Sequence, residues 1–204
     1  MDIVRAQREQ IPATMKTRYR DMGDGTHARV VPAAGSGSLT DAELRADPIL
    51  VGAPDIVVTV TPTLDIAGAY AGGDLLFDSA EVANAVRENG YAAILESVTV
   101  LDKADQGVAF TLLIANANTD FGTPNSAPDP DDTEAETVLG WVPIATSDYV
   151  DLGLSKVACV RNIGLMLQAG AATTSLWIAA INGTGTPTYG AATDLVIKLG
   201  FLRA

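Results

Sequence analysis

The sequence holds very few of the side chains on which catalysis and metal binding depend. Its 204 residues include one histidine, His27, and one cysteine, Cys159. A single cysteine excludes an internal disulfide and a zinc site built from several cysteines. No reaction can be read from the remaining residues. We therefore expect no catalytic residues, no metal site and no cofactor, and a structural component rather than an enzyme.

Long apolar segments are also missing. No run approaches the roughly 20 apolar residues that span a bilayer. The first five residues lack the apolar stretch of a secretory signal. These two features predict a protein that has no membrane partner and that is made and folds in a cytoplasm.

Aromatic residues make up only 5% of the chain, whereas 48% of it is hydrophobic. The core is therefore expected to consist of small and aliphatic side chains. From residue 56 onward, short apolar runs alternate with turns rich in Gly, Asn, Asp, Thr and Pro, as in all-β domains. The clearest strand candidates are Ile56–Thr61, Ala92–Leu101, Val108–Ile114, Ser175–Ile181 and Leu195–Phe201. With about eight strands in all, the pattern predicts a mainly β fold, either a β-sandwich or a jelly roll.

Positive charge is scarce and unevenly placed. The formal net charge of −12 argues against nucleic acid as a partner. Residues 1–31 nevertheless hold six of the 13 basic residues, against four acids. These six are Arg5, Arg8, Lys16, Arg18, Arg20 and Arg29. They suit electrostatic docking on an acidic neighbour, and a solvated tail is an equally good interpretation.

Residues 1–54 are predicted to form an extended N-terminal arm, and residues 55–204 a β-sandwich body. Within the arm, Lys16–Val31 has the alternation and the Gly-rich turn of a hairpin. Pro32–Ser38 has the composition of a flexible linker, and Leu39–Pro48 is compatible with one helical turn. Because a two-stranded hairpin is only marginally stable alone, we expect the arm to lie against another surface.

Three connections in the body are interpreted from their composition. Asp78–Asn89 is predicted to be a short helix or a polar connection, with Val82 and Val86 on its apolar side. Asp102–Gly107 is interpreted as the turn of a hairpin that joins the strands on either side of it. Residues 116–137 form a loop longer than about 12 to 15 residues, which is typical of functional or disordered segments.

Several groups of residues resemble ligand sites, and each has a simpler structural explanation. Asp102, Lys103 and Asp105 are of catalytic types, but charged residues are ordinary in a turn. His27 has Asp24 nearby and no nucleophile beside it. An acidic cluster offers oxygen ligands for Ca²⁺, but it lacks the spacing of an EF-hand, and a solvated loop is the favoured interpretation. Its members are Asp129, Asp131, Asp132, Glu134 and Glu136.

Glycines and aromatic residues allow further interpretations. Gly183–Gly190 has the composition of a phosphate loop, but neither the lysine nor the helix that such a loop needs follows it. It is predicted to be a long hairpin loop. Trp141, Trp177 and Phe201 are predicted to be core or interface anchors.

Three stretches of the sequence resemble the head-decoration, or cement, proteins of tailed bacteriophages. Residues 20–31, RDMGDGTHARVV, are similar to the D-x-G-D-G-T hairpins of phage structural proteins. Residues 58–76, VTVTPTLDIAGAYAGGDLL, resemble the opening of the β domain in that group. Residues 96–103, ESVTVLDK, followed by residues 110–114, FTLLI, resemble its central strand pair.

The resemblance implies a β-sandwich or jelly-roll body on the outer surface of a capsid. It implies the major capsid protein as partner, self-association as a homotrimer or homodimer, and reinforcement of the shell without catalysis. The protein would be found in the virion after synthesis in the host cytoplasm. The basic residues of the arm are then the expected capsid contacts, namely Arg5, Arg8, Lys16, Arg18, Arg20 and Arg29.

Two other functions stay open at this point. Another virion component, such as a head fibre base, a tail protein or an adaptor, would have the same fold. A carbohydrate-binding β-sandwich would instead stack sugars on exposed Trp141, Tyr149 or Tyr189. A cluster of solvent-exposed aromatic side chains would favour the carbohydrate-binding module. Buried aromatic side chains and an arm extended away from the body would favour the cement protein.

Overall fold

The computed structural model describes residues 18–21, 27–30 and 56–203. The chain divides into two compact units, Met1–Leu50 and Val51–Ala204. The linker and the helical turn predicted between Pro32 and Pro48 lie outside the described residues.

The described residues of the first unit form a pair of strands. β1 (Arg18–Asp21) and β2 (His27–Val30) pair antiparallel, with Tyr19 opposite Arg29 in the backbone register. The strands of the predicted hairpin are therefore confirmed.

The described part of the second unit contains nine strands and little helix. The strands are β3 (Ile56–Val60), β4 (Leu75–Val82), β5 (Ala92–Asp102), β6 (Phe110–Ala115), β7 (Val138–Ile144), β8 (Tyr149–Asp151), β9 (Lys156–Gln168), β10 (Leu176–Asn182) and β11 (Leu195–Arg203). A short helix, α3 (Asp132–Ala135), and a 3-10 turn, η2 (Thr146–Asp148), complete the elements. Within these ranges no helix has the length and apolar character to cross a membrane.

Strands that follow one another in the chain lie mostly in opposite sheets. One sheet has the order β3-β11-β5-β9-β8 and the other the order β4-β10-β6-β7, and neighbouring strands are antiparallel. Apart from the short β8, only β6 and β7 are consecutive strands of one sheet. This arrangement is the jelly roll, a pair of sheets built from two Greek keys. The mainly β fold is confirmed, and the strand order selects the jelly roll.

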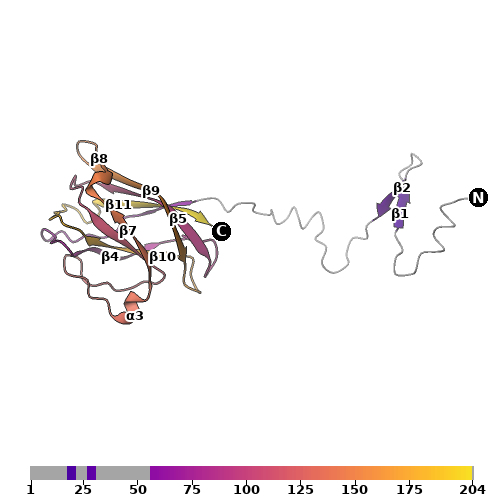
Figure 1. Cartoon of the computed structure of the whole chain (residues 1–204), viewed down its shortest axis with the longest axis horizontal. Coiled ribbons are helices and arrows are strands. Elements are labelled where there is room, and N and C mark those ends of the chain that lie inside the picture. Colours follow the sequence, from indigo (N-terminus) through magenta and orange to yellow (C-terminus); the bar gives the residue numbers. More distant parts are fainter. Residues whose placement is uncertain (1–17, 22–26, 31–55, 204) are drawn as a thin grey trace, which may run out of the picture. The chain divides into compact units, whose positions relative to one another are not determined.

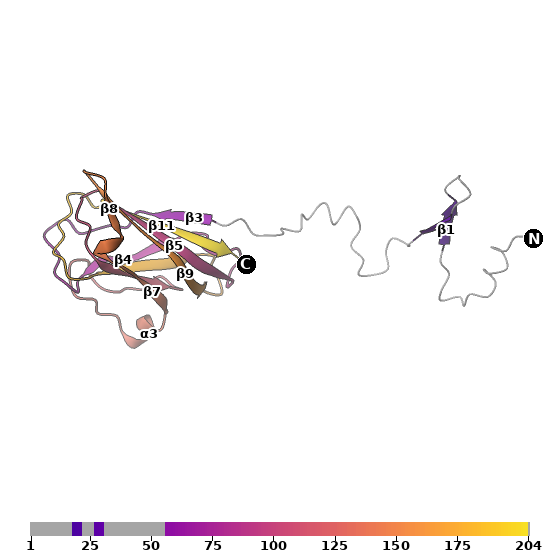
Figure 2. The same ribbon diagram turned by 45° about the horizontal axis from the view of Figure 1, so that its top comes forward.

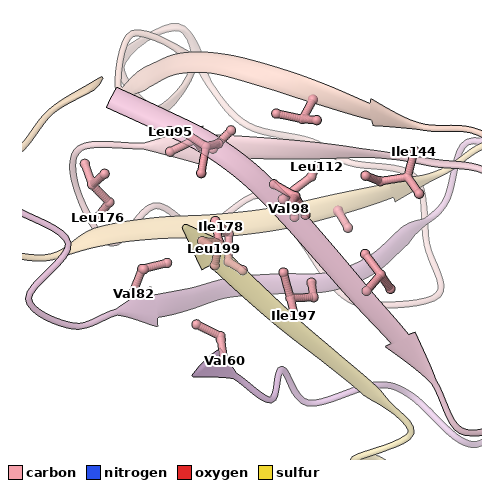
Figure 3. Close-up of a cluster of buried hydrophobic side chains, with 14 of the residues drawn as sticks. Val60, Val82, Leu95, Val98, Leu112, Ile144, Leu176, Ile178, Ile197 and Leu199 are labelled. Atoms are coloured by element: carbon pink, nitrogen blue, oxygen red, sulfur yellow. The ribbon is translucent and has the colours of Figure 1, made fainter. Parts of the chain in front are cut away.

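The core lies between the two sheets (Figure 3). In β5 and β11 nearly every second residue is buried, because successive side chains of a strand point to opposite faces. Side chains of both sheets meet there, among them Val60, Leu95, Val98, Ile197 and Leu199 of one sheet and Val82, Leu112, Ile144, Leu176 and Ile178 of the other. Each fully buried aliphatic side chain contributes about 1.5–3 kcal/mol. This is the small-residue and aliphatic core that the composition predicts.

The strands on either side of Asp102–Gly107 do not pair with each other. β5 pairs with β11 and β9, whereas β6 pairs with β10 and β7. The segment is therefore an arch between the two sheets, and the predicted hairpin was wrong. Gly183–Gly190 likewise joins β10 to β11 across the sandwich, so it is not a hairpin loop either.

The segment Asp78–Asn89 is not a helix. β4 continues to Val82, which lies opposite Leu176 of β10. Val82 and Val86 are both buried, as the sequence predicts. The helix interpretation was wrong because two apolar residues four positions apart also fit the end of a strand and the turn after it.

Residues 116–137 cover the outer face of the four-stranded sheet. Phe121 is 2% exposed and packs in a second, smaller core with Leu75, Ala115 and Ala179. α3 belongs to this segment and lies on the side of the sheet that faces away from the five-stranded sheet (Figures 1 and 2). The long loop is therefore a structural cover. Among the described residues, no comparable segment covers the outer face of the five-stranded sheet.

Candidate interaction surface

The basic residues predicted to contact a capsid lie in the first unit. Arg18 and Arg20 belong to β1, and Arg29 belongs to β2. The other three basic residues, Arg5, Arg8 and Lys16, lie outside the described residues. The strand pairing brings half of the six residues into one hairpin, and their contact with a capsid stays a prediction.

The acidic loop is organised by its own hydrogen bonds. Asp131 caps α3, because its Oδ1 accepts from the backbone N–H of Glu134 at 2.8 Å. Glu134 Oε2 in turn accepts from the backbone N–H of Asp131 at 2.8 Å, which completes a capping box. Among the described residues no group of three or more His, Cys, Asp and Glu side chains is placed to hold a metal ion. Nothing in this geometry supports the calcium interpretation.

Asp102 is not the exposed turn residue that the sequence suggests. It is fully buried at the end of β5. Its Oδ1 accepts from the N–H of Ala104 at 3.0 Å, and its Oδ2 accepts from the N–H of Gly107 at 2.7 Å. Its neighbour Lys103 donates to the carbonyl of Thr193 at 2.9 Å. Asp102 therefore holds the arch between the sheets in place.

Burial makes Asp102 sensitive to pH. Desolvation raises the pKa of its carboxyl above 3.8, against the opposing effect of its backbone hydrogen bonds. The Asp102 carboxyl therefore binds its proton more tightly in the folded chain than in the unfolded chain, and protonation of Asp102 stabilises the fold. This stabilisation is lost as the pH rises through the pKa of Asp102 in the folded state. The free energy of unfolding should fall from pH 4 to pH 7 more in the native chain than in Asp102→Asn. Urea unfolding of both proteins checks this, and a difference that is constant or grows with pH would contradict it.

The loop before β4, which carries much of the resemblance to decoration proteins, is held by Tyr70. This side chain is 1% exposed, and its hydroxyl accepts from the N–H of Asp65 at 2.7 Å and donates to the carbonyl of Leu76 at 3.0 Å. Burial raises the pKa of Tyr70 to about 12, so the hydroxyl remains protonated at neutral pH. Asp74 Oδ2 accepts from the N–H of Ala71 at 2.7 Å. The residues of this stretch are structural.

The aromatic residues considered for sugar stacking do not form an exposed cluster. Trp141 is 66% exposed on the edge strand β7. Tyr189 is buried and packs edge to face on Tyr70, with ring centroids 5.8 Å apart. Tyr149 is half-buried. Phe201 is a core residue, as predicted. The described aromatic side chains thus favour a structural role over carbohydrate binding.

The outer face of the five-stranded sheet, which we call the open face, is not covered by another segment of the described residues. The strand register aligns its outward residues in rows that cross the strands. The rows at the two ends are apolar and consist of Val196, Leu101, Val157 and Val150 at one end and Leu202, Ile94 and Met166 at the other. The rows between them contain Thr59, Lys198, Thr99 and Cys159, and Val57, Gly200, Ser97 and Arg161.

The open face carries most of the exposed apolar surface of the body. Nine large hydrophobic side chains are exposed among the described residues, and six of them lie on this face or on the adjoining β8–β9 turn. These six are Val57, Val150, Leu152, Leu154, Met166 and Leu202. Contiguous apolar patches on a folded protein mark interaction sites. The sequence analysis did not find this surface, although Ile94 and Leu101 are apolar residues on the face of Ala92–Leu101 that alternates with its buried face, as in strands covered on both sides.

The centre of the open face is basic, although the chain as a whole is acidic. Lys198 and Arg161 are exposed, and neither forms an ion pair with another described residue. Glu96, at the β-bulge next to the Ser97–Arg161 pair, is half-buried. A basic centre between two apolar rows suits a protein partner with acidic groups.

Comparisons with known proteins give structural likeness only. No protein-family model matches this sequence, and no curated protein matches it. VP2 of infectious bursal disease virus, in a subviral particle, aligns at 14% identity and a TM-score of 0.31 over 86% of this chain, which spans 38% of the VP2 chain. A chain of Desmodium yellow mottle tymovirus aligns at 15% identity and a TM-score of 0.24, over 76% of this chain and 89% of that one.

A third structure, the full particle of Israeli acute paralysis virus heated to 63 degrees, aligns at 10% identity and a TM-score of 0.26. It covers 95% of this chain and 92% of the viral chain. At these TM-scores the likeness assigns neither fold nor function. The jelly-roll assignment rests on the strand order itself.

Proposed function

We propose that this protein is a non-enzymatic structural component of a virion, which binds the outer surface of the capsid and joins adjacent subunits of the major capsid protein. The observation that carries the proposal is the open face of a jelly-roll body. A rigid β-sandwich that exposes two apolar rows and a basic centre is suited to holding other protein surfaces together.

Two further observations support this choice. The jelly roll is common in viral capsid domains, and also in lectins and cupins, so the fold alone does not select a function. The stretches at residues 20–31, 58–76, 96–103 and 110–114 resemble phage decoration proteins, which supports a role in the virion. The arm would supply the capsid contact through Arg18, Arg20 and Arg29 and the three basic residues before them.

Sedimentation with empty capsids tests the proposal directly. The purified protein is mixed with capsids of the phage that encodes it, and bound protein is measured at about 0.05 M and about 0.5 M salt. We expect saturable binding at low salt that weakens at high salt, because salt screens a contact made by basic residues. Free protein at every capsid concentration would contradict the proposal. Binding to isolated tails instead of capsids would assign the protein to the other class of virion component.

A further inference from the structure

Two leucines protrude from the tight turn between β8 and β9. Leu152 is 62% exposed and Leu154 is 88% exposed. The N–H of Leu152 donates to the carbonyl of Ser155 at 2.9 Å, and the N–H of Gly153 donates to Asp151 Oδ1 at 2.6 Å. Gly153 has a φ of 93°, which favours glycine at this position. We call residues 152–154 the leucine tip. Its backbone is thus held in one conformation while it exposes apolar side chains to solvent.

An apolar groove lies at the opposite end of the same sheet. Its volume is about 270 Å³, and its lining comes from the adjoining ends of β5, β9 and β11. The lining residues are Ala92, Ala93, Ile94, Met166, Leu202 and Arg203. Small-molecule sites usually measure about 300–1,000 Å³. The groove is therefore better matched to one or two inserted side chains.

The leucine tip cannot reach the groove of its own chain. The tip immediately precedes β9, whereas Met166 lies near the end of that 13-residue strand. At about 3.3 Å per residue, the strand separates the two features by roughly 40 Å. Figure 1 shows the β8 turn and the C-terminal end of β11 at opposite ends of the body. Any contact between tip and groove must join two copies of the chain.

The charges around the two features are complementary. Asp148 and Asp151 flank the leucine tip, and Lys156, the nearest base in the sequence, is engaged with Asp105 at 3.5 Å. In the central row of the open face that is nearer to the groove lies the exposed Arg161. An apolar tip with an acidic rim thus corresponds to an apolar groove beside a basic residue, an arrangement that fixes register between partners.

We propose that the leucine tip of one copy inserts into the apolar groove of a second copy, so that the chains associate head to tail in a closed ring. The two surfaces differ, and a heterologous contact that closes gives a ring. A two-fold dimer that made the tip–groove contact in both directions would place the open faces against each other and bring Lys198 and Arg161 of both copies together. The ring avoids this repulsion. The inference deepens the proposed function, of which self-association is a part, and needs no capsid for its test.

Light scattering on the full chain tests the ring. The wild-type protein should have at least three times the monomer mass of 21.1 kDa. Two variants should raise the dissociation constant by about 100-fold or more, since each removes buried apolar contact. The first, Leu152→Asp/Leu154→Asp, alters the tip, and the second, Met166→Asp, alters the groove. Ile66→Asp is the matched control, because Ile66 is 54% exposed and belongs neither to the tip nor to the lining of the groove; this variant should keep the wild-type mass.

Mixing the two defective variants gives the decisive result. The tip variant retains an intact groove and the groove variant an intact tip, so a mixture should form a dimer of twice 21.1 kDa that cannot extend. Unchanged far-UV circular dichroism shows that each variant is folded. A monomeric wild type, a two-fold wild-type dimer, or variants with the wild-type mass would overturn the ring. If the protein forms the ring but does not bind capsids, the proposed function is wrong, whereas the contact between tip and groove is confirmed.

Discussion

Deletion of residues 1–31 is expected to abolish attachment to capsids and to leave the β body folded. The strands and the core of the body lie within residues 56–203, and the chain divides into compact units between Leu50 and Val51. The deletion removes six basic and four acidic residues, so the net charge changes from −12 to −14. Sedimentation with capsids measures the attachment, and urea unfolding measures the stability of the truncated body.

Charge variants of the full chain separate the effect of charge from that of chain length. Arg18→Glu/Arg20→Glu should weaken capsid binding at least about tenfold, because contacts between opposite charges turn into repulsion. Arg87→Glu is the matched control, since Arg87 is an exposed basic residue of the body, and it should bind almost as the native protein does. If the truncated protein occupies capsids fully, the arm is not the contact.

Replacement of Asp102 by alanine is expected to destabilise the body by about 4 kcal/mol. Both carboxylate oxygens of this fully buried residue accept backbone hydrogen bonds, from Ala104 and Gly107. Alanine leaves these two N–H groups without their acceptor, and each buried unsatisfied group costs about 1–3 kcal/mol. Since the arch connects the two sheets, loss of the hydrogen bonds that hold it lowers the stability of the whole sandwich. Urea unfolding at pH 7 measures the change as a shift of the transition midpoint.

Asp105→Asn provides the matched control, because it removes the same charge from the same arch. Asp105 is 39% exposed and has a φ of 59°, a conformation that asparagine also tolerates. Its ion pair with Lys156 is partly exposed and should contribute at most about 1 kcal/mol. Equal destabilisation by the two substitutions would show that Asp102 acts through its charge alone and not through the two backbone hydrogen bonds.

The predicted strands illustrate what a local pattern can establish. The runs beginning at Ile56, Ala92 and Leu195 become β3, β5 and β11 with the same first residues. Alternating apolar residues and the turn residues between them are local properties, so one sequence suffices to find them. The two strands predicted for the arm are confirmed as β1 and β2 for the same reason.

The open face was not predictable in the same way. Leu101 lies far in the sequence from Val150 and Val157, and only the strand register aligns the three residues. Leu152 and Leu154 lie on either side of a glycine, which is the one local sign of an apolar turn. The predicted capsid contacts in the arm rest on charge and on resemblance, and they remain predictions.

The sequence by itself determined the mainly β class, the aliphatic core and the positions of most strands, because these depend on residues next to one another. Tertiary structure alone decided that β5 and β6 belong to different sheets. A strand pair across Asp102–Gly107 and an arch between sheets have the same alternating pattern. The two arrangements differ in the partners of the strands. β5 forms its backbone hydrogen bonds with the distant strand β11, and β6 forms its own with the distant strand β10. This pairing places the inner faces of both sheets in the core.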